Sequence, residues 1–216
     1  MSADVPAGLL LHVQRHIESL YALNPEAPVT DFLIAEEDAA VYPGGGSRTL
    51  VKQDDGALAV AVILDDGVCL DLARADPRVE LNGSNLGSFC VLTEEVSHFL
   101  YLLFCARQDR RVSQLELELQ AEVDKYLTAV LFLGLQNEGA VSSHLLRLLF
   151  DGWRLADGIS PERAERYRAA SGLAGRYCAH LESRFLRRAR LADLAREARR
   201  FYRLDQRAKL EAIAGI

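Results

Sequence analysis

The residues with the clearest chemical potential in this 216-residue chain are carboxylates and one histidine on two neighbouring apolar segments. Glu94, Glu95 and His98 fall within the five residues E-E-V-S-H of the first segment. In a helix, Glu94 and His98 share a face because they are one turn apart. A carboxylate and an imidazole on one face are ligand types that bind divalent metal ions.

The second segment supplies a matching pair of carboxylates. Glu118 and Glu122 are one turn apart, and Lys125 follows them. Carboxylates that face other carboxylates repel each other unless a cation or a proton lies between them. The sequence leaves three sources of positive charge open: Lys125, an arginine from the C-terminal region, or a metal ion.

Both segments are predicted to be helices that hold these groups in place. Residues 90–107 are apolar almost all round, which is typical of a buried helix. A second helix is expected over 114–134, with Ser113 and Glu116 as a capping box and Gly134 as its C-cap. The short connection between the helices suits an antiparallel pair. We therefore expect the side chains of His98 and Glu118 to converge.

This arrangement resembles the gluzincin class of zinc peptidases, which carry H-E-x-x-H on one helix and a glutamate ligand on the next, about twenty residues on. In E-E-V-S-H, Glu94 stands where the class has its first histidine ligand. Glu95 takes the position of the general base, and His98 that of the second ligand. Glu118, twenty residues after His98, takes the position of the third ligand. The resemblance covers residues 6–134.

The resemblance also implies supporting residues and a metal. Glu122 takes the position of the acid that orients a ligand, and Tyr101 lies on the same helix stripe as His98. Glu94, His98 and Glu118 would hold zinc or another divalent metal, with harder metals such as manganese competing better than at a two-histidine site. Because the first histidine is missing, peptidase activity does not follow from the motif.

A structural explanation of the same residues stays open beside the metal site. Glu94 and Glu95 directly after Thr93 are also acids that favour the first turn of a helix. His98 is also explained as a core histidine with its hydrogen bonds satisfied. Glu118 and Glu122 are also explained by ion pairs with Lys125 and with C-terminal arginines.

The rest of the chain predicts an α+β fold. A helix is expected over 6–22, followed by a small, mainly antiparallel sheet of three or four strands over 31–73. The expected strands are DFLIA, RTLVK, ALAVAVIL and VCLDL, separated by PGGGS and by two Asp-Gly turns, Asp54 to Gly56 and Asp65 to Gly67. His12 and His16 form an i, i+4 pair that we expect on the solvated surface.

The C-terminal half is predicted to be helical. We expect a helix over 141–156 that carries Trp153, and a helix start at Ser160-Pro161. Two Arg- and Ala-rich helices should follow to about residue 203 with a break near 185–190, and a last short helix over 205–213. We divide the chain into a zincin-like core domain, 1–136, and a helical C-terminal extension packed on it, 137–216.

Charge and composition limit the possible functions. The net charge is −6, yet residues 147–216 hold 16 Lys and Arg against 9 Asp and Glu. We expect no membrane span and no signal peptide, and hence a cytoplasmic protein. The cysteines should be reduced; they are Cys69, Cys90, Cys105 and Cys178.

Three function classes follow. The leading one is a non-catalytic zincin-like protein that acts in regulation or protein interaction, with a degenerate metal site. The second is a metal-dependent hydrolase with Glu95 as its general base. The third is a nucleic-acid-associated accessory protein that uses the Arg-rich C-terminal region. Because the arginines alternate with acids, we expect a protein partner rather than nucleic acid.

Overall fold

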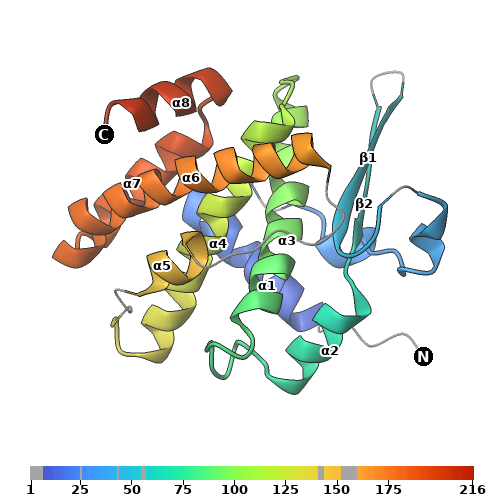
Figure 1. Ribbon diagram of the computed structural model, residues 1–216, viewed down its shortest axis with the longest axis horizontal. Helices are drawn as coiled ribbons and strands as arrows, with labels where there is room; N and C mark the ends of the chain where they lie inside the picture. Colours follow the sequence, from blue (N-terminus) through green and yellow to red (C-terminus); the bar gives the residue numbers. More distant parts are fainter. Residues whose placement is uncertain (1–6, 25, 43, 55–56, 141–143, 152–159) are drawn as a thin grey trace.

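The computed structural model describes residues 7–24, 26–42, 44–54, 57–140, 144–151 and 160–216, and it shows a mostly helical α+β fold (Figure 1). The helices are α1 (Ala7–Tyr21), α2 (Asp66–Arg74), α3 (Leu86–Arg107), α4 (Gln114–Gln136), α5 (Leu145–Phe150), α6 (Pro161–Arg184), α7 (Leu191–Tyr202) and α8 (Gln206–Ala214). The strands are β1 (Arg48–Asp54) and β2 (Ala57–Ile63), and the short 3-10 helices are η1 (Val29–Phe32), η2 (Asp38–Val41) and η3 (Leu186–Arg188).

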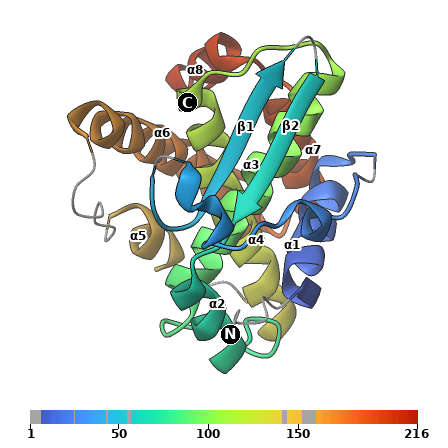
Figure 2. The same ribbon diagram turned by 90° about the vertical axis from the view of Figure 1, so that its right-hand side faces the viewer.

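Helix α3 lies at the centre of the molecule. It contacts α1, α2 and α4, and the β1–β2 hairpin lies against it (Figure 2). Sequence reasoning expected no segment that meets the length and apolarity of a membrane span, and this was wrong for α3. However, 67% of its most apolar window is buried inside the molecule. Its apolar surface is therefore that of a core helix.

The sheet is an antiparallel hairpin, smaller than expected. β1 and β2 pair from Arg48 opposite Ile63 to Asp54 opposite Ala57, as the Asp-Gly motif predicts. The turn residues 55–56 lie outside the described residues. The expected first strand, residues 31–35, begins with the last two residues of η1, Asp31 and Phe32, and Leu33 then forms an isolated parallel bridge with Val62.

The expected strand VCLDL is part of α2, and the reason is a helix cap. The Asp65 side chain accepts hydrogen bonds from the backbone N–H groups of Gly67 (2.8 Å) and Val68 (3.4 Å). These bonds satisfy two of the free donors at a helix start. Asp65 therefore begins a helix at a motif that sequence reasoning assigned to a hairpin turn.

The other helix boundaries follow side-chain caps. Ser113, Ser160 and Asp205 each accept a hydrogen bond from a backbone N–H of the first turn of α4, α6 and α8, respectively, as predicted for the first two. The prediction of Gly134 as a C-cap was wrong, because α4 continues to Gln136 and the chain turns at Glu138 and Gly139, which both have positive φ.

The helix expected over 141–156 is shorter in the part that the structure describes. It is α5, which covers Leu145–Phe150. Trp153 lies outside the described residues. The break expected near 185–190 is confirmed, because η3 separates α6 from α7.

The C-terminal helices complete the core that the first half begins. Helix α6 crosses α4, and the ring of Tyr202 in α7 stacks on that of Tyr21 in α1 at 4.0 Å between centroids. One hydrophobic cluster runs from Leu9 in α1 to Ile213 in α8. Residues on both sides of position 136 therefore share a single core.

Candidate functional site

The carboxylates of Glu94 and Glu118 and the imidazole of His98 converge between α3 and α4. One potential ligand atom from each residue lies within 4.8 Å of the other two. The Nε2 atom of His98 is 3.5 Å from Oε2 of Glu118. The predicted convergence of His98 and Glu118 is therefore confirmed. The donor types and their spacing could hold a divalent metal ion.

Lys125 supplies a positive charge to this group. Its Nζ donates hydrogen bonds to Oε2 of Glu94 at 2.9 Å and to Oε1 of Glu122 at 2.7 Å. Burial alone would raise the pKa of Glu94, but the charges of Lys125 and His98 outweigh it and lower that pKa below its usual value. Burial raises the pKa of Glu122 despite the same ammonium. Glu122 thus pairs with a lysine in this structure.

An arginine from α6 approaches the other side of the group. Nε of Arg166 lies 3.9 Å from Oε1 of Glu118. At that distance the contact is an ion pair without a hydrogen bond. Two of the three sources of positive charge that the sequence left open, a lysine and a C-terminal arginine, are therefore both present.

His98 lies between two buried carboxylates. Its Nδ1 is 3.8 Å from Oε2 of Glu95, on the opposite side of the ring from Glu118. Burial alone would lower the pKa of His98, but the carboxylates of Glu118 and Glu95 outweigh it and raise the pKa to about 10. Among the described residues Nε2 has no well-aligned hydrogen-bond partner. The raised pKa favours the protonated form of His98, whose positive charge lies beside these carboxylates.

Glu95 is held by the hairpin. Glu95 is 4% exposed, and its Oε2 accepts a hydrogen bond of 2.7 Å from the Thr49 hydroxyl on β1. The group Glu94, Glu95, His98, Glu118, Glu122 and Lys125, here called the α3–α4 cluster, therefore joins β1, α3 and α4, and Arg166 extends it to α6.

Tyr101 belongs to a different network at the start of α4. Its hydroxyl donates to Oε1 of Glu116 at 2.6 Å, and Nη1 of Arg110 donates to the same oxygen at 2.6 Å. Glu116 also donates its backbone N–H to the Ser113 hydroxyl, as the capping box predicts. His98 and Tyr101 thus lie on the same stripe of α3 but belong to different networks.

Sequence reasoning missed a further buried network around Asp124. This carboxylate accepts hydrogen bonds from Ser97 at 2.5 Å, from Gln120 at 2.9 Å and from the hydroxyl of Tyr21. Nζ of Lys209 in α8 donates to Gln120 at 2.5 Å. Burial raises the pKa of Asp124 to about 6. The i, i+4 spacing of Gln120 and Asp124 on an apolar helix was a usable clue, whereas the contact from α8 was not visible in the sequence.

The remaining candidates have structural positions. The rings of His12 and His16 lie 4.6 Å apart and both contact the ring of Phe132, so this pair is half-buried and not solvated as expected. All four cysteines are free, as predicted.

Comparison of the chain with protein-family models, curated proteins and solved structures gives no match.

Proposed function

We propose that this chain is a non-catalytic zincin-like protein that acts through protein interaction, and that Lys125 replaces a metal ion beside Glu94. The observation that carries the proposal is the pair of hydrogen bonds from Lys125 Nζ to Glu94 and Glu122. A zinc peptidase needs a neutral ligand and an open metal position at this point. Here a carboxylate and a tethered ammonium stand in that place.

The position of Glu95 also favours a structural role. A general base must reach the water or substrate proton that it takes. Glu95 is buried, accepts a hydrogen bond from Thr49 and lies beside His98. These contacts suit a carboxylate that ties the hairpin to α3. They are also consistent with a core whose role is to hold a binding surface in shape.

The charges within the cluster are largely balanced by protein groups. Four carboxylates face the ammonium of Lys125, the guanidinium of Arg166 and a protonated His98. Buried charges are stable when they are paired and hydrogen-bonded. A metal ion is therefore not needed to explain why these acids lie together.

A second candidate function rests on the convergence of Glu94, His98 and Glu118. These residues would hold a divalent ion such as zinc or manganese. When bound, the metal would supply Lewis-acid chemistry, and Glu95 would be the base of a metal-dependent hydrolase. Lys125 would have to leave Glu94, and His98 would have to lose its proton.

Metal content of protein purified without a His-tag tests the proposal. We expect substoichiometric zinc and manganese in the wild type by elemental analysis, because Lys125 already neutralises Glu94. Lys125→Met removes the positive charge beside the Glu94 carboxylate. This should raise zinc affinity by about tenfold or more, because loss of that competing charge is worth about 1.4 kcal/mol or more of binding free energy. Lys125→Arg, which keeps the charge, is the matched control.

The opposite outcome would favour the hydrolase. Near-stoichiometric metal in the wild type that is lost in His98→Ala would contradict the proposal. Metal-dependent cleavage of a peptide library that is lost in Glu95→Gln would establish the second function in its place.

The C-terminal arginines favour a protein partner over a nucleic acid. Many C-terminal arginines are already paired: Arg187 with Glu182, Arg190 with Asp193 and Arg200 with Glu197, each at 2.6–2.7 Å. Such pairing leaves less charge for phosphate contacts. We retain a protein partner and a cytoplasmic location as part of the proposal.

A further inference from the structure

Two adjoining hollows lie along α6 and α7 and have volumes of about 540 and 410 Å³. Both are lined by His180 and Ile216, so we treat them as one feature, the α6–α7 groove. Arg176, His180 and Arg184 approach it from α6, and Arg196 and Arg200 approach it from α7. The groove is far from the α3–α4 cluster in sequence and shares none of its residues.

The groove is basic in a protein whose net charge is −6. Six arginines and three acids line the two hollows. The acids are each tied to arginines, for example Glu182 to Arg187 at 2.6 Å. Arg176 and Arg184 form no ion pair with any described residue, and both are exposed. The guanidinium of Arg184 lies over the ring of Phe185 at 5.9 Å, a contact that leaves its N–H groups able to meet a carboxylate from another molecule.

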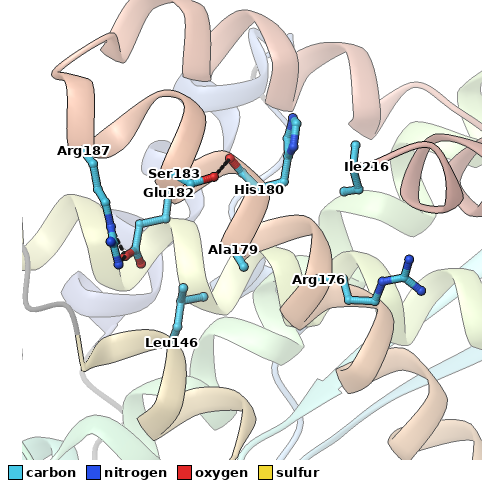
Figure 3. A pocket seen from close by; sticks show the side chains of 8 residues that line it. All are labelled: Leu146, Arg176, Ala179, His180, Glu182, Ser183, Arg187 and Ile216. Atoms are coloured by element: carbon cyan, nitrogen blue, oxygen red, sulfur yellow. Dashed lines mark hydrogen bonds and ion pairs between the residues drawn. The ribbon is translucent and has the colours of Figure 1, made fainter.

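The floor of the larger hollow is apolar. Figure 3 shows Ala179 and Leu146 between the side chains of Arg187 at one end and Arg176 at the other. Ile216, which is 44% exposed, adds a further apolar side chain at the rim. A hollow with an apolar floor and guanidinium groups at its ends matches a segment that carries both an aliphatic side chain and carboxylates.

We propose that the α6–α7 groove binds an acidic segment of a partner protein, with one aliphatic side chain seated against Ala179 and Leu146. Carboxylates on either side of that anchor pair with Arg176 and Arg184. This inference rests on the proposed role in protein interaction and names the surface and the chemistry of the partner.

The spacing along α6 sets the length of the segment. Arg184 is eight positions after Arg176, which corresponds to about 12 Å along a helix axis. An extended chain covers that distance in about four residues. The recognised element is therefore short, with two acidic positions about four residues apart and an aliphatic residue between them.

A nucleic acid fits the groove less well than a peptide. The arginines of the lining would attract phosphates as well as carboxylates, so the two kinds of partner differ in their fit to the other groups of the groove. Single-stranded nucleic acids also use exposed aromatic rings on which bases stack. The aromatic ring in this lining, Phe185, is 8% exposed. The apolar floor has no role in phosphate binding.

Fluorescence anisotropy with the full chain tests the inference. The probe is a labelled eight-residue peptide, Glu-Asp-Leu-Glu-Glu-Leu-Asp-Glu, titrated at 50 mM and 300 mM NaCl. We expect saturable binding that weakens with salt. Arg176→Glu should weaken it by about tenfold or more, because a repulsive charge replaces an attractive one. Ala179→Phe should weaken it by a similar factor, because the ring fills the floor.

Two controls make the result specific. Arg168→Glu changes an exposed arginine of the same helix that lies outside the groove lining, and it should bind as the wild type does. The same peptide with Gln and Asn in place of its acids should not bind. Circular dichroism checks that each variant keeps its helical content.

Three outcomes would overturn the inference. The first is no saturable binding of the acidic peptide, and the second is equal binding by the wild type, Arg176→Glu and Ala179→Phe. The third is tighter binding of a labelled 20-nucleotide single strand that Arg176→Glu abolishes.

Failure of the proposed function is separate, because it is measured by metal content and peptide cleavage. Groove binding by a metal-loaded hydrolase would refute only the non-catalytic role, and metal-free, inactive protein without groove binding would refute only the groove.

Discussion

The ammonium group of Lys209 is buried between two aromatic rings, with Nζ 4.5 Å from the centroid of Tyr101 and 4.9 Å from that of Phe201. Desolvation lowers the pKa of Lys209 to about 7, although Glu116 and Asp124 act in the opposite direction. Arg110 and Cys105 are the other titratable groups that influence it. A single side chain of the last helix thus experiences the charges of α3, α4 and the loop between them.

The low pKa of Lys209 predicts a specific pH dependence of stability. Between about pH 7 and the ordinary lysine value of 10.5, the unfolded chain binds more protons at Lys209 than the folded chain does. Stability from this group should therefore rise with pH across that window. In urea unfolding at pH 7 and pH 9.5, the wild type should gain about 3 kcal/mol relative to Lys209→Met over this interval. Parallel stability curves for the two proteins would contradict the assignment.

At the scale of elements, a side-chain cap produced a helix where β-propensity alone predicted a strand. Residues 68–72 look like a strand by composition, yet Asp65 caps them as the start of α2. The hairpin before it pairs antiparallel from Arg48 opposite Ile63 to Asp54 opposite Ala57, as the Asp-Gly motif predicts. Helix α2 then packs on α3 through Cys69 and Leu72, which are buried.

The cap at Asp65 is directly testable. Asp65→Ala should lower the free energy of unfolding by about 1 kcal/mol, because two backbone donors lose their acceptor. Asp66→Ala removes a neighbouring acid that does not cap, so it should cost only about 0.3 kcal/mol. Chemical denaturation of both variants makes the comparison. Equal losses would show that the helix dipole, and not the cap, accounts for the effect.

At the scale of the molecule, the basic C-terminal helices lie on the more acidic first half. Arg199 donates to the backbone carbonyl of Leu20 at 2.7 Å, and Arg203 donates to that of Tyr21 at 3.0 Å. These arginines satisfy carbonyls at the C-terminal end of α1. Arg166 adds its ion pair with Glu118. The opposite charges of the two halves thus meet partly within the molecule.

Truncation after Ile159 should therefore expose the core and cause aggregation. Helix α6 covers the apolar face of α4, where Tyr126, Leu127 and Ala129 are at most 1% exposed. Removing α6, α7 and α8 would leave that face to water, and large exposed apolar patches promote association. Light scattering and size-exclusion chromatography of the 1–159 fragment measure the effect. A monomeric fragment that melts cooperatively would show that the C-terminal helices are an independent module.

Local sequence patterns were sufficient for much of the fold. Apolar periodicity located α1, α3 and α4, and the polar residues Ser113 and Ser160 marked two helix starts, because these features depend on neighbours within one or two turns. The same local geometry placed Glu94 and His98 on one face. The twenty-residue spacing and the short loop then predicted that His98 and Glu118 would meet.

Only the tertiary structure decided which positive charge serves the acids of the α3–α4 cluster. The sequence allowed Lys125, a C-terminal arginine or a metal, because helical spacing defines a face but not the rotation of one helix against the next. The packing of α3 on α4 brings Lys125 to Glu94, and the crossing of α6 brings Arg166 to Glu118. The burial of Lys209 beside Gln120 likewise joins residues 89 positions apart. Such contacts depend on how whole helices pack, and no local pattern encodes that.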